Sequence, residues 1–266
     1  MKLCISLLAH DQPDVLTDQL RNFAIYNPTA MVVLHLNPSI GEYVVPSDLP
    51  IEVIVNPERF VLQWDVSMVH AHNSNFKYIQ SHEFDKFELH ASNDLFVKHG
   101  RDTNPLEADL NADLKLVPLS NDWNVSSKLR SSTEWNTLLD QFPPAPEYCV
   151  YFEGMSFAKS LFKELVTLYD TYMPDFIPLC AMEEMFYPTI ARRLTSSVGP
   201  STQFMSFLFS LDDLHRVRSD VIWCDPSFDD GTYEFNMKHR YSVRRITRDM
   251  NDPVRTAIRN YSMEME

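Results

Sequence analysis

Two adjacent acids, Glu183 and Glu184, open a stretch that the sequence predicts to be a helix. Successive residues of a helix point about 100° apart, so one carboxylate can face a cleft while the other faces away. A carboxylate placed in this way can act as a general base. Both acids could also be ordinary first-turn residues, which the helix dipole favours.

The C-terminal segment is basic, although the protein as a whole carries a formal net charge of −14. Between residues 238 and 259 it contains Lys238, Arg240, Arg244, Arg245, Arg248, Arg255 and Arg259, with only Asp249 and Asp252 as acids. Forked guanidinium groups suit the oxygens of a diphosphate. A candidate base and a cationic segment together predict transfer chemistry on a phosphorylated donor, and a solvated charged face is the alternative.

Composition excludes several other classes of function. The negative net charge disfavours nucleic acid as a partner, because the long-range field has the wrong sign. The apolar run from Leu3 to Ala9 is too short to span a membrane, so we expect a cytoplasmic protein without a transmembrane segment, with peripheral contact to the inner face of the membrane left open. With five glycines and neither a P-loop nor a Gly-x-Gly-x-x-Gly pattern, phosphate must be bound by side chains.

Strands and helices alternate along the chain. Apolar runs predict strands at Leu3 to Leu8, Met31 to Leu36, Ile51 to Val55 and Phe87 to Ala91, and helical spacing predicts helices after Asp11, from Val66 to Ile79 and from Ser156 to Tyr169. Residues 99 to 148 are interpreted as a long excursion. The pattern predicts one α/β domain over 1–266, with a mostly parallel central sheet flanked by helices.

Ligands of such sheets bind outside the carboxyl ends of the strands. That rule places His10, Asp11 and the turn from Ser92 to Asp94 on one rim. Asp94 could be a metal ligand, a ribose contact or a turn residue. The four cysteines, Cys4, Cys149, Cys180 and Cys224, form no metal-binding pattern, and we expect neither a metal nor another cofactor.

Several short segments, in order, resemble the core-2/I-branching N-acetylglucosaminyltransferase and peptide O-xylosyltransferase family. They are Leu8 to Pro13, Val69 to Asn73, Leu89 to Lys98 with Asp94 and Lys98 matching, Phe152 to Ser156, Ala181 to Glu184 followed by Thr189, and His239 to Arg245. In place of the family's aromatic residue and proline after Asp94, this chain has Leu95 and Phe96.

The resemblance implies a Rossmann-like fold of the GT-A type and an inverting glycosyltransferase that needs no metal ion. It identifies Glu184 as the catalytic base and Glu183 as its acidic neighbour. Glu153 and Glu183 are expected to contact the acceptor or to lie just behind the reacting groups. The match points to Arg244 for the donor diphosphate, with Arg245 as the neighbouring option. Arg248, in the same basic segment 238–260, is expected to join them. His10 and Asp11 are expected near the nucleoside, and Asp94 near the ribose or donor sugar.

The expected partners are a nucleotide-sugar donor and a carbohydrate or glycolipid acceptor. Two alternatives stay open at this stage. One is a non-catalytic module that binds a nucleotide or glycan. The other is metal-dependent chemistry at Asp94 with Asp229 or Asp230, which a chelator would abolish.

Overall fold

The computed structural model describes residues 1–10, 12–62, 67–104, 106–117, 124–174, 181–205, 210–219, 222–224, 234–244 and 246–263. Two predicted site residues, Asp11 and Arg245, lie outside the described residues. The same holds for Asp229 and Asp230, which belong to the metal-dependent alternative.

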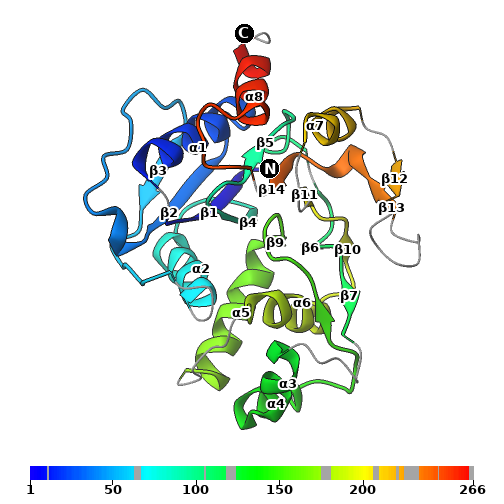
Figure 1. Cartoon of the computed structure of the whole chain (residues 1–266). Coiled ribbons are helices and arrows are strands. Elements are labelled where there is room, and N and C mark those ends of the chain that lie inside the picture. Colours follow the sequence, from blue (N-terminus) through cyan, green and yellow to red (C-terminus); the bar gives the residue numbers. More distant parts are fainter. Residues whose placement is uncertain are drawn as a thin grey trace.

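A seven-stranded sheet with the order β10-β6-β9-β4-β1-β2-β3 runs through the molecule (Figure 1). Its strands are β1 (Leu3–Ala9), β2 (Met31–Leu36), β3 (Glu52–Val55), β4 (Lys86–Ala91), β6 (Leu110–Asn111), β9 (Ser156–Ala158) and β10 (Val198–Gly199). Neighbours are parallel from β3 through β2 and β1 to β4, and β10 is parallel to β6. Only β9, among these strands, runs antiparallel to its neighbours β4 and β6. The predicted mostly parallel α/β sheet is confirmed.

Helices cover both faces of this sheet (Figure 1). The described helices are α1 (Pro13–Tyr26), α2 (Ser67–Ile79), α3 (Asn124–Ser131), α4 (Thr133–Leu139), α5 (Lys159–Tyr172), α6 (Glu183–Leu194), α7 (Leu211–Arg218) and α8 (Pro253–Met263), with short 3₁₀ turns η1 (Pro38–Ile40) and η2 (Met237–His239). None of the described helices combines the length and the apolar composition needed to cross a bilayer.

The two faces have separate hydrophobic cores, because successive strand residues point to opposite sides. On β1, Ile5 and Leu7 join the core under α1, α7 and α8, whereas Cys4 joins the core under α2, α5 and α6. On β4, Phe87 and Leu89 belong to the second core. Glu88 and His90 alternate with these apolar residues, so they point to the opposite face, and two polar side chains of β4 are buried in the interior.

Short strands complete the structure around the main sheet. A three-stranded sheet joins β11 (Gln203–Met205), β14 (Ser242–Arg244) and β5 (Leu95–Phe96) in that order. Two pairs follow, β7 (Lys115–Leu116) with β8 (Tyr148–Cys149) and β12 (Ile222–Cys224) with β13 (Glu234–Asn236). Because β5 comes directly after the turn that ends in Asp94, its pairing with β14 carries Arg244 towards that turn.

The predicted bounds of one helix were wrong. The helix predicted from Ser156 begins at Lys159, because Ser156–Ala158 form β9 between β4 and β6. The excursion 99–148 contains β6, β7, α3 and α4, of which α3 and α4 supply Leu129, Trp135 and Leu138 to the core under α5 and α6.

Candidate active site

The turn after β4 holds Asp94 in a folded-back position. Asn93 takes a positive φ of 73°, a conformation that asparagine tolerates better than most residues. The Asp94 carboxylate then turns back, and its Oδ2 accepts hydrogen bonds from the Ala91 amide at 3.0 Å and from His90 Nδ1 at 3.2 Å. Asp94 is fully buried, and its Oδ1 has no hydrogen-bond partner among the described residues.

Glu153 approaches the same place from the loop before β9. Gly154 fixes this loop at a φ of 74°, and its amide donates to the Leu89 carbonyl at 2.8 Å. Glu153 Oε1 lies 2.6 Å from Arg244 Nη2, while Oε2 is buried without a partner in the described part of the chain. Burial raises the pKa of Glu153 to about 8; Arg244 opposes the rise, and the nearby carboxylates of Asp94 and Glu184 add to it.

Glu183 and Glu184 occupy the first turn of α6, as predicted. The chain enters this helix through Ala181 at a φ of 56°, which is unfavourable for alanine. Glu183 is buried, and burial raises its pKa well above the usual value, whereas Glu184 is half-buried. The pair is therefore divided as the helical geometry predicts, with Glu184 the more accessible.

Thr189 supports this helix and does not touch the acids in any described contact. Its hydroxyl donates to the Tyr148 carbonyl and accepts from the Tyr148 amide, both at 2.9 Å. One turn earlier, the Glu184 carbonyl accepts from the Val150 amide at 2.9 Å. The two contacts fasten α6 to β8 and the residue after it, so that the first turn of α6 is anchored beside the other acids.

Backbone strain is concentrated around these acids. In the described chain, Asn93 and Ala181 are the non-glycine residues with positive φ. Asn93 directly precedes Asp94, and Ala181 lies two residues before Glu183. Gly154, which has positive φ as well, directly follows Glu153. Unfavourable backbone conformations of this kind persist where the surrounding structure enforces them, and they occur preferentially at functional sites.

The basic C-terminal segment divides into two groups. Arg244 reaches the acids, and the exposed Arg248 donates to His10 Nε2 at 3.1 Å. Arg240 is buried, pairs with Asp113 at 2.7 Å and donates to the Ser201 and Gln203 carbonyls. The interpretation of the segment as one cationic patch is therefore wrong in part, because some of its arginines serve the interior.

Two further arginines, Arg255 and Arg259, join α8 to α1. Arg255 is fully buried and bonds to Asp18, and Arg259 lies 3.6 Å from the other carboxylate oxygen of Asp18. Arg255 also donates to the Thr247 carbonyl at 3.1 Å. These two arginines hold the last helix against the first.

His10 lies on the rim that the sequence predicts, beside the turn after β4. Its backbone amide donates to Ser92 Oγ at 3.0 Å, and its Nδ1 lies 2.9 Å from the same oxygen. Ser92 Oγ in turn donates to the Leu8 carbonyl, so the ends of β1 and β4 are joined. With Nδ1 donating to Ser92, Nε2 is the acceptor for Arg248, and the rim therefore carries a guanidinium held over the end of β1.

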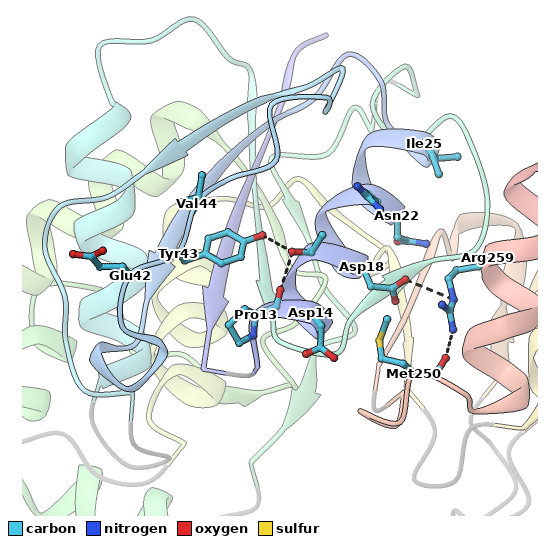
Figure 2. Close-up of a pocket in the computed structure, with 12 residues that line it drawn as sticks. Pro13, Asp14, Asp18, Asn22, Ile25, Glu42, Tyr43, Val44, Met250 and Arg259 are labelled. Carbon is cyan, nitrogen blue, oxygen red and sulfur yellow. Dashed lines mark hydrogen bonds and ion pairs between the residues drawn. The ribbon is translucent and has the colours of Figure 1, made fainter.

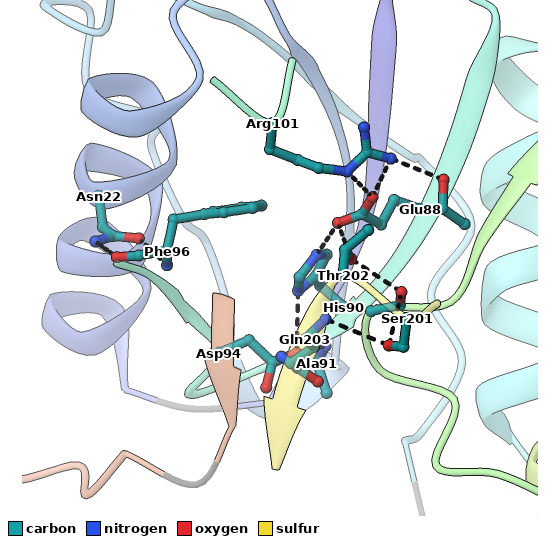
Figure 3. Close-up of polar contacts among 12 residues, drawn as sticks. Asn22, Glu88, His90, Ala91, Asp94, Phe96, Arg101, Ser201, Thr202 and Gln203 are labelled. Atoms are coloured by element: carbon teal, nitrogen blue, oxygen red, sulfur yellow. Dashed lines mark hydrogen bonds and ion pairs between the residues drawn. The ribbon is translucent and has the colours of Figure 1, made fainter. Parts of the chain in front are cut away.

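A buried chain of charged side chains runs behind Asp94 and was missed by the sequence prediction (Figure 3). Arg101 bonds to Glu88, Glu88 to His90, and His90 to Asp94. The signal was present in β4, where Glu88 and His90 interrupt an apolar run at alternate positions and so share one face. What the sequence did not provide was Arg101, which comes from a loop beyond β5.

A pocket of about 770 Å³ lies elsewhere, along α1 (Figure 2). Its lining includes Asp14 and Asn22 of α1, Tyr43, and Met250 and Arg259 from the C-terminal segment. No predicted site residue lines it in the part of the chain that the structure describes. Arg259 is turned towards Asp18 and the Met250 carbonyl, and Arg21, which also lines the pocket, pairs with Asp48 at 3.3 Å, so both arginines of the lining have carboxylate partners.

Among the described residues, no three His, Cys, Asp or Glu side chains are grouped so that they could hold a metal ion. Arg244 is the cation that contacts the acids, through Glu153. The arrangement as a whole is a set of buried and half-buried carboxyl groups with one guanidinium among them, which can exchange protons and bind hydroxyl and phosphate groups.

Comparisons with known proteins add little to this picture. No family model and no curated protein matches the chain, so the resemblance to the core-2/I-branching family stays a prediction. Among solved structures, galactosyltransferase LgtC in complex with donor and acceptor sugar analogues aligns with 8% identity and a TM-score of 0.46, over 99% of this chain and 96% of that chain. An active-site mutant of LgtC aligns with 9% identity and a TM-score of 0.47, again over 99% of this chain and 96% of that chain. With TM-scores below 0.5, these likenesses assign neither a family nor a function.

Proposed function

We propose that this protein is an inverting glycosyltransferase with a GT-A-type fold that moves a sugar from a nucleotide-diphosphate donor to a hydroxyl of a carbohydrate or glycolipid acceptor, without a metal ion. The observation that carries the proposal is the convergence of Asp94, Glu153, Glu184 and Arg244. They come from the end of β4, the loop before β9, α6 and β14, yet their charges interact at one place.

Glu184 is the base in this proposal. Its carboxylate takes the proton of the acceptor hydroxyl, and the acceptor oxygen forms a bond to the anomeric carbon of the donor sugar from the face opposite the diphosphate. The bond from that carbon to the diphosphate oxygen breaks, and its electron pair leaves with the nucleoside diphosphate. Glu184 suits this role better than Glu183, because Glu183 is buried and burial raises its pKa well above the usual value.

Arg244 is the main group for the leaving diphosphate, with Arg245 and Arg248 as further contacts in a segment 238–260 that completes the donor site. A guanidinium close to the breaking bond stabilises the charge that develops there. Arg244 already bonds to Glu153, so the diphosphate must share or displace this partner. His10, which bonds to Arg248, and Asp11 are assigned to the nucleoside.

Asp94 and Glu153 are assigned to hydroxyl groups of the bound sugars. Each has one buried carboxylate oxygen without a partner among the described residues. A buried acceptor without a hydrogen bond costs about 1–3 kcal/mol, which a ligand hydroxyl would recover. Both side chains are covered in the free protein, so the ligand has to displace the groups over them.

The test is Glu184→Gln with Glu164→Gln as the matched control, since Glu164 is an exposed acid on α5. A thermal-shift screen of nucleotide sugars, with and without EDTA, first identifies the donor. We expect Glu184→Gln to lower transfer about 10²- to 10⁴-fold while donor binding is retained, and Glu164→Gln and EDTA to have no effect. Transfer at the wild-type rate by folded Glu184→Gln would show that the base is wrong. Binding without turnover in the wild type would favour a non-catalytic module, and loss of activity with EDTA a metal-dependent enzyme.

A further inference from the structure

The side chain behind Asp94 is His90, and both of its ring nitrogens are engaged by carboxylates. Nδ1 lies 3.2 Å from Asp94 Oδ2, and Nε2 lies 3.1 Å from Glu88 Oε1 (Figure 3). Glu88 Oε2 in turn accepts from Arg101 Nε at 2.7 Å and Nη2 at 2.6 Å. The charged groups of all four side chains are at most 1% exposed.

Charge alternates along this chain when His90 is protonated. Arg101 and His90 are then positive, Glu88 and Asp94 negative, and the buried group is neutral overall. A neutral His90 would leave one buried negative charge without a counter-charge, which is costly in the interior. Burial alone would lower the pKa of His90, but hydrogen bonds to Asp94 and Glu88, together with their charges, raise it to about 9.

The groups packed around His90 agree with this ionisation. Phe23 of α1 and Phe96 of β5 present ring edges and faces to the imidazole at centroid distances of 5.4 and 5.3 Å. From α2, His72 interacts electrostatically with His90, and burial keeps the pKa of His72 well below its usual value, so it is neutral. On the far side of Glu88, Arg101 is the second cation of this buried series of side chains.

The same chain reaches the Glu153 loop. Thr202 Oγ1 lies 2.9 Å from Glu88 Oε1 and 3.0 Å from the Gly154 carbonyl. Glu88 is therefore tied both to His90, which holds Asp94, and to the residue after Glu153. On the Asp94 side, His90 and the Ala91 amide take up Oδ2 and leave only Oδ1 for another partner.

We propose that His90 is a positioning residue that, through its Nδ1 bond, fixes the Asp94 carboxylate so that Oδ1 is presented to a hydroxyl of the bound sugar nucleotide. This rests on the proposed function. His90 does not touch the ligand; it acts through Asp94, with Glu88 and Arg101 holding its other side.

Two substitutions separate the two bonds of His90. In His90→Asn the side-chain amide can take the place of Nδ1 and still donate to Asp94, whereas in His90→Gln the amide takes the place of Nε2 and can donate to Glu88 only. We expect His90→Gln to raise KM or Kd for the nucleotide sugar about tenfold or more with a smaller change in kcat, and His90→Asn to stay within a few-fold of the wild type. Equal losses in the two variants would overturn the proposal.

A double-mutant cycle tests whether His90 acts through Asp94. We expect His90→Gln to have little further effect on donor affinity in an Asp94→Asn background, because the group that it positions has already been altered. Additive losses would mean that His90 affects the site by another route and would refute the assignment.

Nuclear magnetic resonance of the ring ¹⁵N nuclei keeps this inference separate from the proposed function. With or without a ligand, both nitrogens of His90 should be protonated at neutral pH, and Asp94→Asn should lower the pKa at which they titrate. An unchanged titration in Asp94→Asn would overturn the positioning role. If no nucleotide sugar binds the wild type, the proposed function fails and the presentation of Oδ1 to a sugar fails with it, whatever the resonance result; if one binds, the variants above decide.

Discussion

Gly154→Ala tests whether the loop that carries Glu153 is held as tightly as the structure indicates. A Cβ atom at this position would lie 2.2 Å from Gln203 Cβ and 2.9 Å from the Gln203 backbone nitrogen. The backbone of Gln203 belongs to β11 and cannot turn away as a flexible side chain would. The added methyl group must therefore move one of the two segments.

Gly41→Ala is the matched control. Gly41 has a φ of 72°, almost the same as the 74° of Gly154, but a Cβ there meets no atom within 4 Å. It ends the short turn η1 at the surface. Both substitutions carry the cost of alanine at a positive φ, about 1–3 kcal/mol, and both reduce the freedom of the unfolded chain equally. Their difference isolates the clash with Gln203.

Overpacking of this severity adds about 1–3 kcal/mol to the backbone cost. We therefore expect Gly154→Ala to lower the free energy of unfolding by about 2–6 kcal/mol and Gly41→Ala by about 1–3 kcal/mol. Urea unfolding followed by circular dichroism measures both, with the midpoints compared at a constant m value. If Gly154→Ala loses no more than Gly41→Ala, the loop is free to adjust and the close packing of the Glu153 segment on β11 is refuted.

Two further predictions concern the charged interior. His90 has a pKa of about 9 when folded against an ordinary value of 6.5, so the folded protein keeps this proton where the unfolded chain has lost it. The stabilisation from this proton should be complete below pH 6.5 and disappear as the pH rises through 9. In urea unfolding, the difference in unfolding free energy between wild type and His90→Asn should shrink by about 3 kcal/mol across that range. A difference that does not change with pH would show that His90 is neutral. Arg255→Met should cost about 3–5 kcal/mol by leaving Asp18 short of its buried partner, whereas Arg248→Ala at the exposed rim should change stability by less than about 0.5 kcal/mol but weaken donor binding. If Arg255→Met and Arg248→Ala lost equal stability, the division of the C-terminal arginines into an interior group and a rim group would be contradicted.

The strands β1 and β2 were predictable because each is an almost continuous apolar run. The segments Leu3–Ala9 and Met31–Leu36 are buried on both faces, as strands in the middle of a parallel sheet must be, and their composition reflects it. The start of α6 was predictable for a similar reason, since acids are favoured in a first turn and apolar residues follow at helical intervals. The local amino-acid composition is therefore enough to predict these strands and the start of this helix.

Strand β9 could not be predicted in the same way. Ser156, Phe157 and Ala158 continue smoothly into the helical pattern of α5, and nothing in their types marks a strand. They adopt an extended conformation because β4 and β6 supply hydrogen-bond partners on both sides, and Leu110 of β6 is far away in the sequence. Pairing with distant residues overrides local preference here.

The roles of the C-terminal arginines could not be predicted from local sequence either. Arg244 and Arg255 are equivalent in a charge count, yet one meets Glu153 and the other Asp18. The difference depends on α8 packing against α1 near the opposite end of the chain, which a local pattern of charge does not contain. The sequence could nominate Arg244 only through its spacing from His239 in the family resemblance.

The acids at this site are stabilised in three different ways, and together these single out Glu184. Asp94 belongs to an alternating chain of charges, Glu153 is paired with Arg244, and Glu183 is buried with a pKa raised well above its usual value. Each of these three side chains is buried, whereas Glu184 is half-exposed. In the proposed reaction, an acceptor hydroxyl arriving from solvent would therefore meet Glu184 before the other described acids of this site, which is the property that a base for an incoming acceptor requires.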